Sequence, residues 1–101
     1  MQTPYWLITA FEPFDRAKSN SSQLLLEAAR PQLQDCQIET QIPVTFKGAW
    51  PHLKSILDQK PFAGVLCLGQ AEGRTRLSLE RVALNWMEAR IPDNEGYQPQ
   101  G

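Results

Sequence analysis

Hydrophobic and polar positions follow two patterns along the chain, and both predict β-strands. Residues 5–11 and 63–68 are continuous apolar runs, whereas residues 36–46 alternate apolar and polar side chains and contain Pro43. A continuous run is typical of a strand that is covered on both faces, while alternation and proline favour a half-exposed strand at a sheet edge. We therefore expect 63–68 to be a central strand and 36–46 to be an edge strand.

Two helices are predicted between these strands. Asn20 and Gln23 resemble a capping box, and Pro31 is expected to end the helix that begins there. The apolar stripe of this helix is expected to comprise Leu24, Leu25, Ala28 and Ala29. A second helix is predicted from about Trp50 to Gln59, with an inner face of Trp50, Leu53, Ile56 and Leu57.

Residues 76–86 are expected to form another extended segment, which carries Glu80 between apolar positions. The predicted order is then strand, helix, strand, helix, strand, loop, strand. This alternation indicates βαβ units in one α/β domain over residues 1–101, with a mostly parallel sheet between helices.

Composition narrows the classes of partner. Ten Lys and Arg residues face eleven Asp and Glu residues, so no basic surplus favours nucleic acid. No apolar run has the length of a membrane span, and no secretory signal is recognisable. Cys36 and Cys67 form neither a CxxC motif nor a disulfide framework, and no residue cluster has metal-ligand spacing. We expect a reduced, cytoplasmic protein without a cofactor.

The loops after the first and third predicted strands are candidates for a binding site, because ligands bind beyond the carboxyl ends of strands in open α/β sheets. Phe11 and Phe14 could form an apolar slot, and Asn20 and Gln70 could bind polar groups. In a purely structural alternative, the two phenylalanines seal the end of the sheet and Asn20 only caps a helix. The glycines of "GQAEGRT" lack the spacing of a phosphate-binding loop.

Few side chains in this sequence could act in catalysis. Glu80 is either part of a structural ion pair, an edge-exposed acid, or a desolvated carboxylate that orients a histidine or acts as a general base. His52 is expected on a solvated helix face, and Cys67 is expected to be buried in a central strand. A catalytic triad of Cys67, His52 and Glu80 is therefore not expected.

Five stretches occur in an order that resembles pyroglutamyl peptidase I, a cysteine peptidase that removes N-terminal pyroglutamate. These stretches are "FEPF", "IPVTF", "LGQAEGRT", "ERVALN" and "ARIPDNEGYQP". The resemblance covers nearly the whole chain, and it implies a three-layer α/β/α sandwich with a mixed sheet.

The resemblance also implies roles for individual residues. Glu80 matches the acid of a Cys, His and Glu triad, and Arg90 matches a residue that helps to stabilise the oxyanion. Phe11 and Phe14 match an aromatic pair that encloses the pyroglutamyl ring. Other positions of that pocket are matched by Asn20, Gln70 and Ile91.

The sequence departs from the family pattern in several places. The family's cysteine and histidine lie downstream of "IPDNEG", and this sequence reaches Gly101 without either in its family context. Asp15 and Arg16 stand where the family tends to have glycines, and Ser21 stands where it tends to have proline.

We therefore expect the N-terminal portion of the enzyme, with a fold incomplete at its C-terminus, exposed apolar surface and no activity of its own. The complete protein is expected to self-associate and to act on peptides with N-terminal pyroglutamate. The alternative is a truncated, non-catalytic relative that binds a small ligand or a protein.

Overall fold

Three strands alternate with two α-helices in the computed structural model, which describes residues 4–15 and 17–101. The elements in chain order are β1 (Trp6–Phe11), α1 (Ser21–Ala29), the 3₁₀ turn η1 (Arg30–Gln32), β2 (Cys36–Ile42), α2 (Ala49–Leu57) and β3 (Gly64–Cys67). The strands are parallel in the order β2-β1-β3. The expected βαβ order is confirmed as far as β3.

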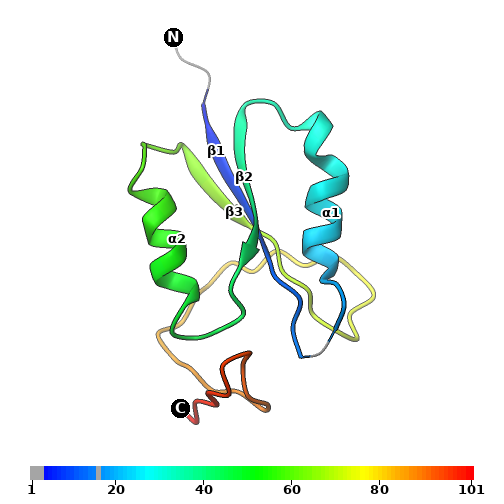
Figure 1. The fold of residues 1–101 in the computed structure, drawn as a ribbon, viewed down its shortest axis with the longest axis vertical. Helices are drawn as coiled ribbons and strands as arrows, with labels where there is room; N and C mark the ends of the chain where they lie inside the picture. The colour runs from blue at the N-terminus through cyan, green and yellow to red at the C-terminus, as the bar shows by residue number, and fades with distance from the viewer. Residues whose placement is uncertain (1–3, 16) are drawn as a thin grey trace.

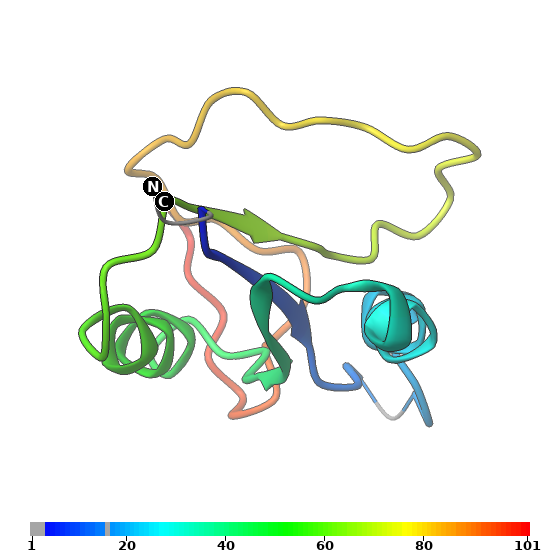
Figure 2. The ribbon, with the colours of Figure 1, turned by 90° about the horizontal axis from the view of Figure 1, so that it is seen from above.

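The two crossover connections run in opposite directions across the sheet. The chain moves from β1 to the neighbouring β2, and then returns past β1 to β3. Right-handed crossovers in opposite directions place their helices on opposite faces, and Figures 1 and 2 show the sheet between α1 and α2. The expected layering of helix, sheet and helix is confirmed. The reversal between β1 and β3 is the position where open α/β sheets bind ligands.

The main apolar core lies around Leu7, Ile42 and Ile56, which are all buried. Leu53 and Leu57 of α2 pack against this core, as predicted for the inner face of that helix. Trp50 was assigned to the same face, but its side chain is 57% exposed. Trp50 lies in the first turn of α2, at the end of the helix where the loop after β2 arrives, and it is correspondingly less covered.

The buried face of α1 differs from the predicted stripe. Ser22 and Leu26 are buried, whereas Leu24 and Leu25 are more than half exposed. The Ser22 hydroxyl accepts a hydrogen bond from the Phe11 N–H at 3.3 Å. That contact turns Ser22 toward β1 and brings Leu26, one turn later, to the same inner side.

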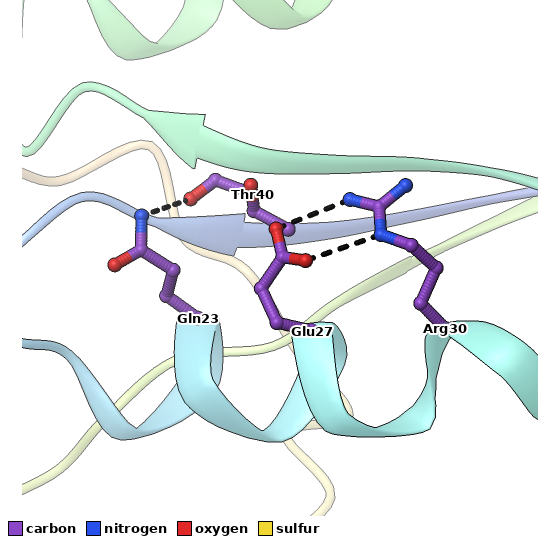
Figure 3. Close-up of polar contacts among 4 residues, drawn as sticks. All are labelled: Gln23, Glu27, Arg30 and Thr40. Atoms are coloured by element: carbon purple, nitrogen blue, oxygen red, sulfur yellow. Dashed lines mark hydrogen bonds and ion pairs between the residues drawn. The ribbon is translucent and has the colours of Figure 1, made fainter.

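The ends of α1 agree with the sequence, but the capping box does not form. Asn20 Oδ1 accepts a hydrogen bond from the Ser22 N–H at 3.0 Å, so Asn20 is the N-cap. Gln23 instead donates to the Thr40 carbonyl at 2.8 Å and ties α1 to β2 (Figure 3). Beside this contact, Glu27 pairs with Arg30 at 3.1 Å. The helix ends at Ala29, just before Pro31, as predicted.

Two strand predictions near the end of the chain are wrong. β3 was expected to be central, but it lies at an edge of the described sheet, and Val65, Leu66 and Cys67 are exposed. Residues 76–86 contain no assigned strand and arch away beyond β3 (Figure 2). A strand is maintained by hydrogen bonds to a neighbour, and among the described residues this segment has no strand partner.

Apolar side chains are exposed along this arch, as expected for an incomplete fold: Leu77, Leu79, Val82, Leu84 and Trp86. β2 does lie at the other edge, as predicted, and it ends at Ile42 just before Pro43. Within residues 4–15 and 17–101, no helix has the length and apolar character that crossing a membrane requires.

Candidate functional site

An apolar cavity of about 540 Å³ lies at the carboxyl ends of β1 and β2. Three segments form its walls: the loop after β1, the loop between β2 and α2, and residues 89–93. Figure 1 shows the C-terminal segment lying beyond the ends of the strands, near the loop that leads into α2. The lining residues are Phe11, Phe14, Pro43, Val44, Thr45, Phe46, Ala49, Trp50, Ala89, Arg90, Ile91 and Asp93.

The carboxylate of Asp93 attaches the third wall to the second. It accepts hydrogen bonds from the N–H groups of Phe46 at 2.8 Å, Glu95 at 2.9 Å and Tyr97 at 3.0 Å. Desolvation raises the pKa of Asp93, but the hydrogen bonds from Phe46, Tyr97 and Glu95 and the charge of Lys47 together hold that pKa below its ordinary value. A carboxylate in this setting stays ionised and keeps the turn closed.

Aromatic contacts reinforce the same junction. The rings of Phe46 and Tyr97 meet edge to face, with centroids 6.1 Å apart. The Lys47 ammonium lies 4.8 Å from the centroid of the Tyr97 ring. Both geometries are favourable for aromatic rings, and they fix the segment that carries Arg90 against the loop after β2.

The chemistry of the apolar cavity suits a compact ring with few polar groups. Its lining is mostly aromatic and aliphatic, and its charged members are Arg90 and Asp93. Because Asp93 already accepts three backbone hydrogen bonds, Arg90 is the charge that remains available to a ligand. Arginine at the rim can stabilise a carbonyl oxygen that becomes negative during acyl transfer.

A second hollow, of about 850 Å³, lies between β3 and the arch formed by the following residues. Its lining includes Leu25, Cys67, Gln70, Arg74 and Glu80. The Glu80 carboxylate pairs with Arg74 at 2.9 Å, and these side chains are 73% and 53% exposed. Of the alternatives left open for Glu80, this geometry agrees with an exposed, ion-paired acid and not with a desolvated carboxylate, because the arch carries the side chain into solvent beside Arg74.

The structure brings together only part of the predicted site. Phe11, Phe14, Arg90 and Ile91 all line the apolar cavity, whereas Gln70 and Glu80 line the second hollow. Gln70 Oε1 accepts a hydrogen bond from the Ser21 N–H at 2.7 Å and thereby joins the loop after β3 to the start of α1.

Asn20 lines neither space, and its amide is engaged locally. Its Oδ1 accepts from Ser22, and its Nδ2 donates to the Glu12 carbonyl at 3.3 Å. This arrangement agrees with the structural alternative, in which Asn20 is a helix cap.

The remaining candidates for catalysis lie outside the apolar cavity. His52 is exposed on α2, as predicted. Cys67 was expected to be buried but is exposed, because β3 has no neighbour on its outer side among the described residues. Cys36 is half-buried at the first residue of β2. Across residues 4–15 and 17–101, no group of His, Cys, Asp and Glu side chains could hold a metal ion.

Sequence reasoning missed one wall of the cavity and the residues that fasten it. Val44, Phe46 and Trp50 were assigned to a strand and a helix face. Asp93 and Asn94 lie in the "ARIPDNEGYQP" stretch, and the resemblance implies no role for them. The signal was available, since Asp and Asn in a turn commonly bind nearby backbone groups.

A family model described as pyroglutamyl peptidase matches residues 5–101. The chain belongs to the pyroglutamyl peptidase family. The pyrrolidone-carboxylate peptidase of Bacillus subtilis (strain 168) is 42% identical over 99 residues, covering 92% of this chain and 44% of that protein. The resemblance stated from the sequence, to the N-terminal portion of such an enzyme, is confirmed.

Solved structures of family members show the same fold. The pyroglutamyl peptidase I of Bacillus amyloliquefaciens superimposes with a TM-score of 0.87 at 34% identity, covering 99% of this chain and 49% of that one. The pyrrolidone carboxyl peptidase of Fervidobacterium islandicum AW-1 gives a TM-score of 0.88 at 28% identity, covering 97% and 48%. The chain thus spans about half the length of the family members it matches.

Proposed function

We propose that this chain is the N-terminal portion of a cysteine peptidase that hydrolyses the bond after an N-terminal pyroglutamate. One observation carries the proposal: Phe11, Phe14, Arg90 and Ile91, which the resemblance assigns to substrate binding and oxyanion stabilisation, line a single cavity. The pyroglutamyl ring is a flat lactam with one N–H and one C=O, and it suits an apolar slot with few polar groups.

The proposed reaction is acyl transfer to a cysteine. A histidine takes the proton of the cysteine thiol, and the thiolate attacks the scissile carbonyl carbon that follows the pyroglutamyl ring. The C–N bond then breaks, the histidine gives the proton to the departing amine, and water hydrolyses the thioester to release pyroglutamate and restore the thiol. Arg90 stabilises the negative oxygen of the tetrahedral intermediate. Glu80 orients the histidine. Its exposure supports this role, because a solvated ion pair with Arg74 contributes little and can be exchanged for a histidine partner.

The cysteine and histidine are proposed to come from polypeptide outside this sequence, in keeping with its coverage of about half of its relatives. The test measures turnover of a chromogenic pyroglutamyl amide by the chain alone and together with the remaining half of the Bacillus amyloliquefaciens enzyme. We expect background turnover by the chain alone and measurable turnover by the mixture.

Variants of the chain sharpen this test. Glu80→Gln should lower turnover by the mixture on the order of 10³-fold or more, whereas Cys67→Ser and His52→Ala should not affect it. Turnover by the chain alone that is lost in both Cys67→Ser and His52→Ala would show that this chain contains its own nucleophile and base.

A second candidate function is ligand binding without catalysis. It is favoured by the fact that this chain supplies twelve residues from three segments to the lining of the apolar cavity. A non-catalytic module would bind a pyroglutamyl dipeptide, yet a mixture with the remaining half of a relative would stay inactive.

The proposal extends to partners and location. The substrate is a peptide with an N-terminal pyroglutamate, the location is the cytoplasm, and the complete protein is a homo-oligomer. Two free cysteines among the described residues and a formal net charge of −1 support a reduced compartment and a partner other than nucleic acid.

A further inference from the structure

Two polar side chains, Glu12 and Asn94, connect all three walls of the apolar cavity. Neither of them lines the cavity. They are 82 residues apart in the sequence, and Asn94 Nδ2 donates to Glu12 Oε1 at 3.1 Å. We call this pair the clasp.

Asn94 makes three further contacts from the C-terminal wall. Its Nδ2 also donates to the Pro13 carbonyl at 3.0 Å, and its Oδ1 accepts from the Asp15 N–H at 3.2 Å. Its backbone N–H donates to the Val44 carbonyl at 3.0 Å. One residue thus brackets Phe14 on both sides and also holds the loop after β2.

Glu12 closes the remaining connection, between the first and second walls. Its Oε1 accepts from the Val44 N–H at 3.0 Å as well as from Asn94. The Glu12 backbone N–H donates to the Ile42 carbonyl at 3.0 Å, which extends the contact between β1 and β2 into the loops. Each pair of walls is therefore joined by at least one bond of the clasp.

The clasp binds the backbone of a residue in an unusual conformation, Asp15. Asp15 has a φ of +53°, in the left-handed region that favours glycine. Among the described residues, no other non-glycine residue has a positive φ. The Asp15 N–H donates a hydrogen bond to Asn94 Oδ1. The hydrogen bond holds a side-chain-bearing residue in the turn that directly follows Phe14, where relatives were expected to carry glycine.

We propose that Glu12 and Asn94 are positioning residues, which set the separation of the cavity walls and the placement of Phe14 for ligand binding. The identity of the ligand, a pyroglutamyl group, rests on the proposed function. The contacts of the clasp do not depend on that identity. The positioning of the walls and the binding of the ligand can therefore be tested separately.

The first test is amide hydrogen exchange in the 101-residue chain. Asn94→Ala removes the acceptor of the Asp15 N–H, and Glu12→Ala removes the acceptor of the Val44 N–H. If the pair acts as a unit, each variant accelerates both amides by roughly 3- to 10-fold, and the double variant adds little. Acceleration confined to the amide that lost its acceptor, with additive effects in the double variant, would overturn the proposal.

Conservative and matched variants separate positioning from general destabilisation. Glu12→Gln keeps an oxygen acceptor, so its exchange rates should remain within about twofold of wild type. Asn85→Ala and Glu72→Gln change exposed residues of the same types outside the clasp and should have no effect. A loss of protection spread evenly over β1 and β2 in Asn94→Ala would indicate a purely structural role and count against positioning.

The second test is binding of L-pyroglutamyl-L-alanine, followed by NMR. Asn94→Ala and Glu12→Ala should weaken binding by about 10-fold, while Glu12→Gln and the two matched variants bind like wild type. Equal binding by all variants would overturn positioning. If the wild-type chain does not bind the dipeptide, the proposed function of the cavity fails, and the exchange measurements alone decide whether the clasp positions its walls.

Discussion

Glu80 and Arg74 form an ion pair at 2.9 Å on the exposed arch after β3, in a different hollow from Arg90. Exposed pairs of this kind contribute little to folding. We therefore predict that Glu80→Gln changes the free energy of unfolding of the chain by less than about 0.5 kcal/mol.

In the mixture with the remaining half of a relative, the same change should lower kcat by on the order of 10³-fold or more. Urea denaturation and turnover of a pyroglutamyl amide measure the two effects. A large loss of stability with unchanged kcat would mean that Glu80 is only a structural acid.

Asp93 makes the closure of the apolar cavity sensitive to pH. Desolvation acts against ionisation, but hydrogen bonds from Phe46, Tyr97 and Glu95 outweigh it and hold the pKa of Asp93 below its ordinary value of 3.8. A group whose folded pKa is depressed contributes stability above its unfolded pKa, and that contribution is lost as the pH falls through the folded pKa. We expect the contact to be fully formed above about pH 4 and to open as the pH falls through the lowered pKa of Asp93.

The measurement for Asp93 is an NMR titration of its carboxyl group, combined with exchange of the Phe46 N–H between pH 5 and pH 2.5. Asp93→Asn should remove the acid-dependent step, and the exposed Asp35→Asn should preserve it. A titration midpoint of Asp93 at or above its ordinary value would contradict the geometry of the turn.

Leu7 is a fully buried member of the main apolar core. It lies in the central strand, where it packs with Ile42 and Ile56. Leu7→Ala removes buried apolar volume and should lower the free energy of unfolding by about 2–5 kcal/mol. Leu24→Ala is the matched control, because Leu24 is 58% exposed on α1 and its truncation should cost less than about 0.5 kcal/mol. Equal losses in the two variants would show that β1 is not at the centre of the packed core.

Gln23 joins α1 to β2 through a part-buried hydrogen bond, while Glu27 and Arg30 form an exposed pair one turn further along (Figure 3). Gln23→Ala leaves the Thr40 carbonyl without this donor and should cost about 1 kcal/mol. Glu27→Ala should cost less, because solvent screens the ion pair. Denaturation of both variants under the same conditions provides the comparison, and a larger effect of Glu27→Ala would contradict it.

Local signals in the sequence predict the first part of the fold well. The runs around Leu7 and Leu66 each form a strand, Asn20 caps α1, and Pro31 follows its end. These features depend on neighbours in the sequence, so spacing and residue type suffice to predict them. The parallel sheet between two helices follows from the alternation of strands and helices along the chain.

The failures concern features that depend on distant partners. Residues 76–86 have the pattern of a strand, yet a strand also needs a neighbour to pair with, and the pattern does not show whether one is present. The exposure of Cys67, which was expected to be buried, follows from the same fact. Spacing along the chain also gave no indication of the bond between Glu12 and Asn94, which joins loops 82 residues apart.

The assignment of the apolar cavity to pyroglutamate is tested most directly by measuring whether the 101-residue chain binds a pyroglutamyl group. Titration calorimetry would compare L-pyroglutamyl-L-alanine with L-prolyl-L-alanine, which has the same ring size but lacks the lactam carbonyl. Phe14→Ala, in the cavity, is paired with Leu24→Ala, which lies on α1 away from it.

We expect the wild-type chain and Leu24→Ala to bind the pyroglutamyl dipeptide in preference to the prolyl dipeptide, and Phe14→Ala to bind it at least about 10-fold more weakly. Equal binding of the two dipeptides, or equal affinity of Phe14→Ala and wild type, would contradict the assignment of this cavity to pyroglutamate.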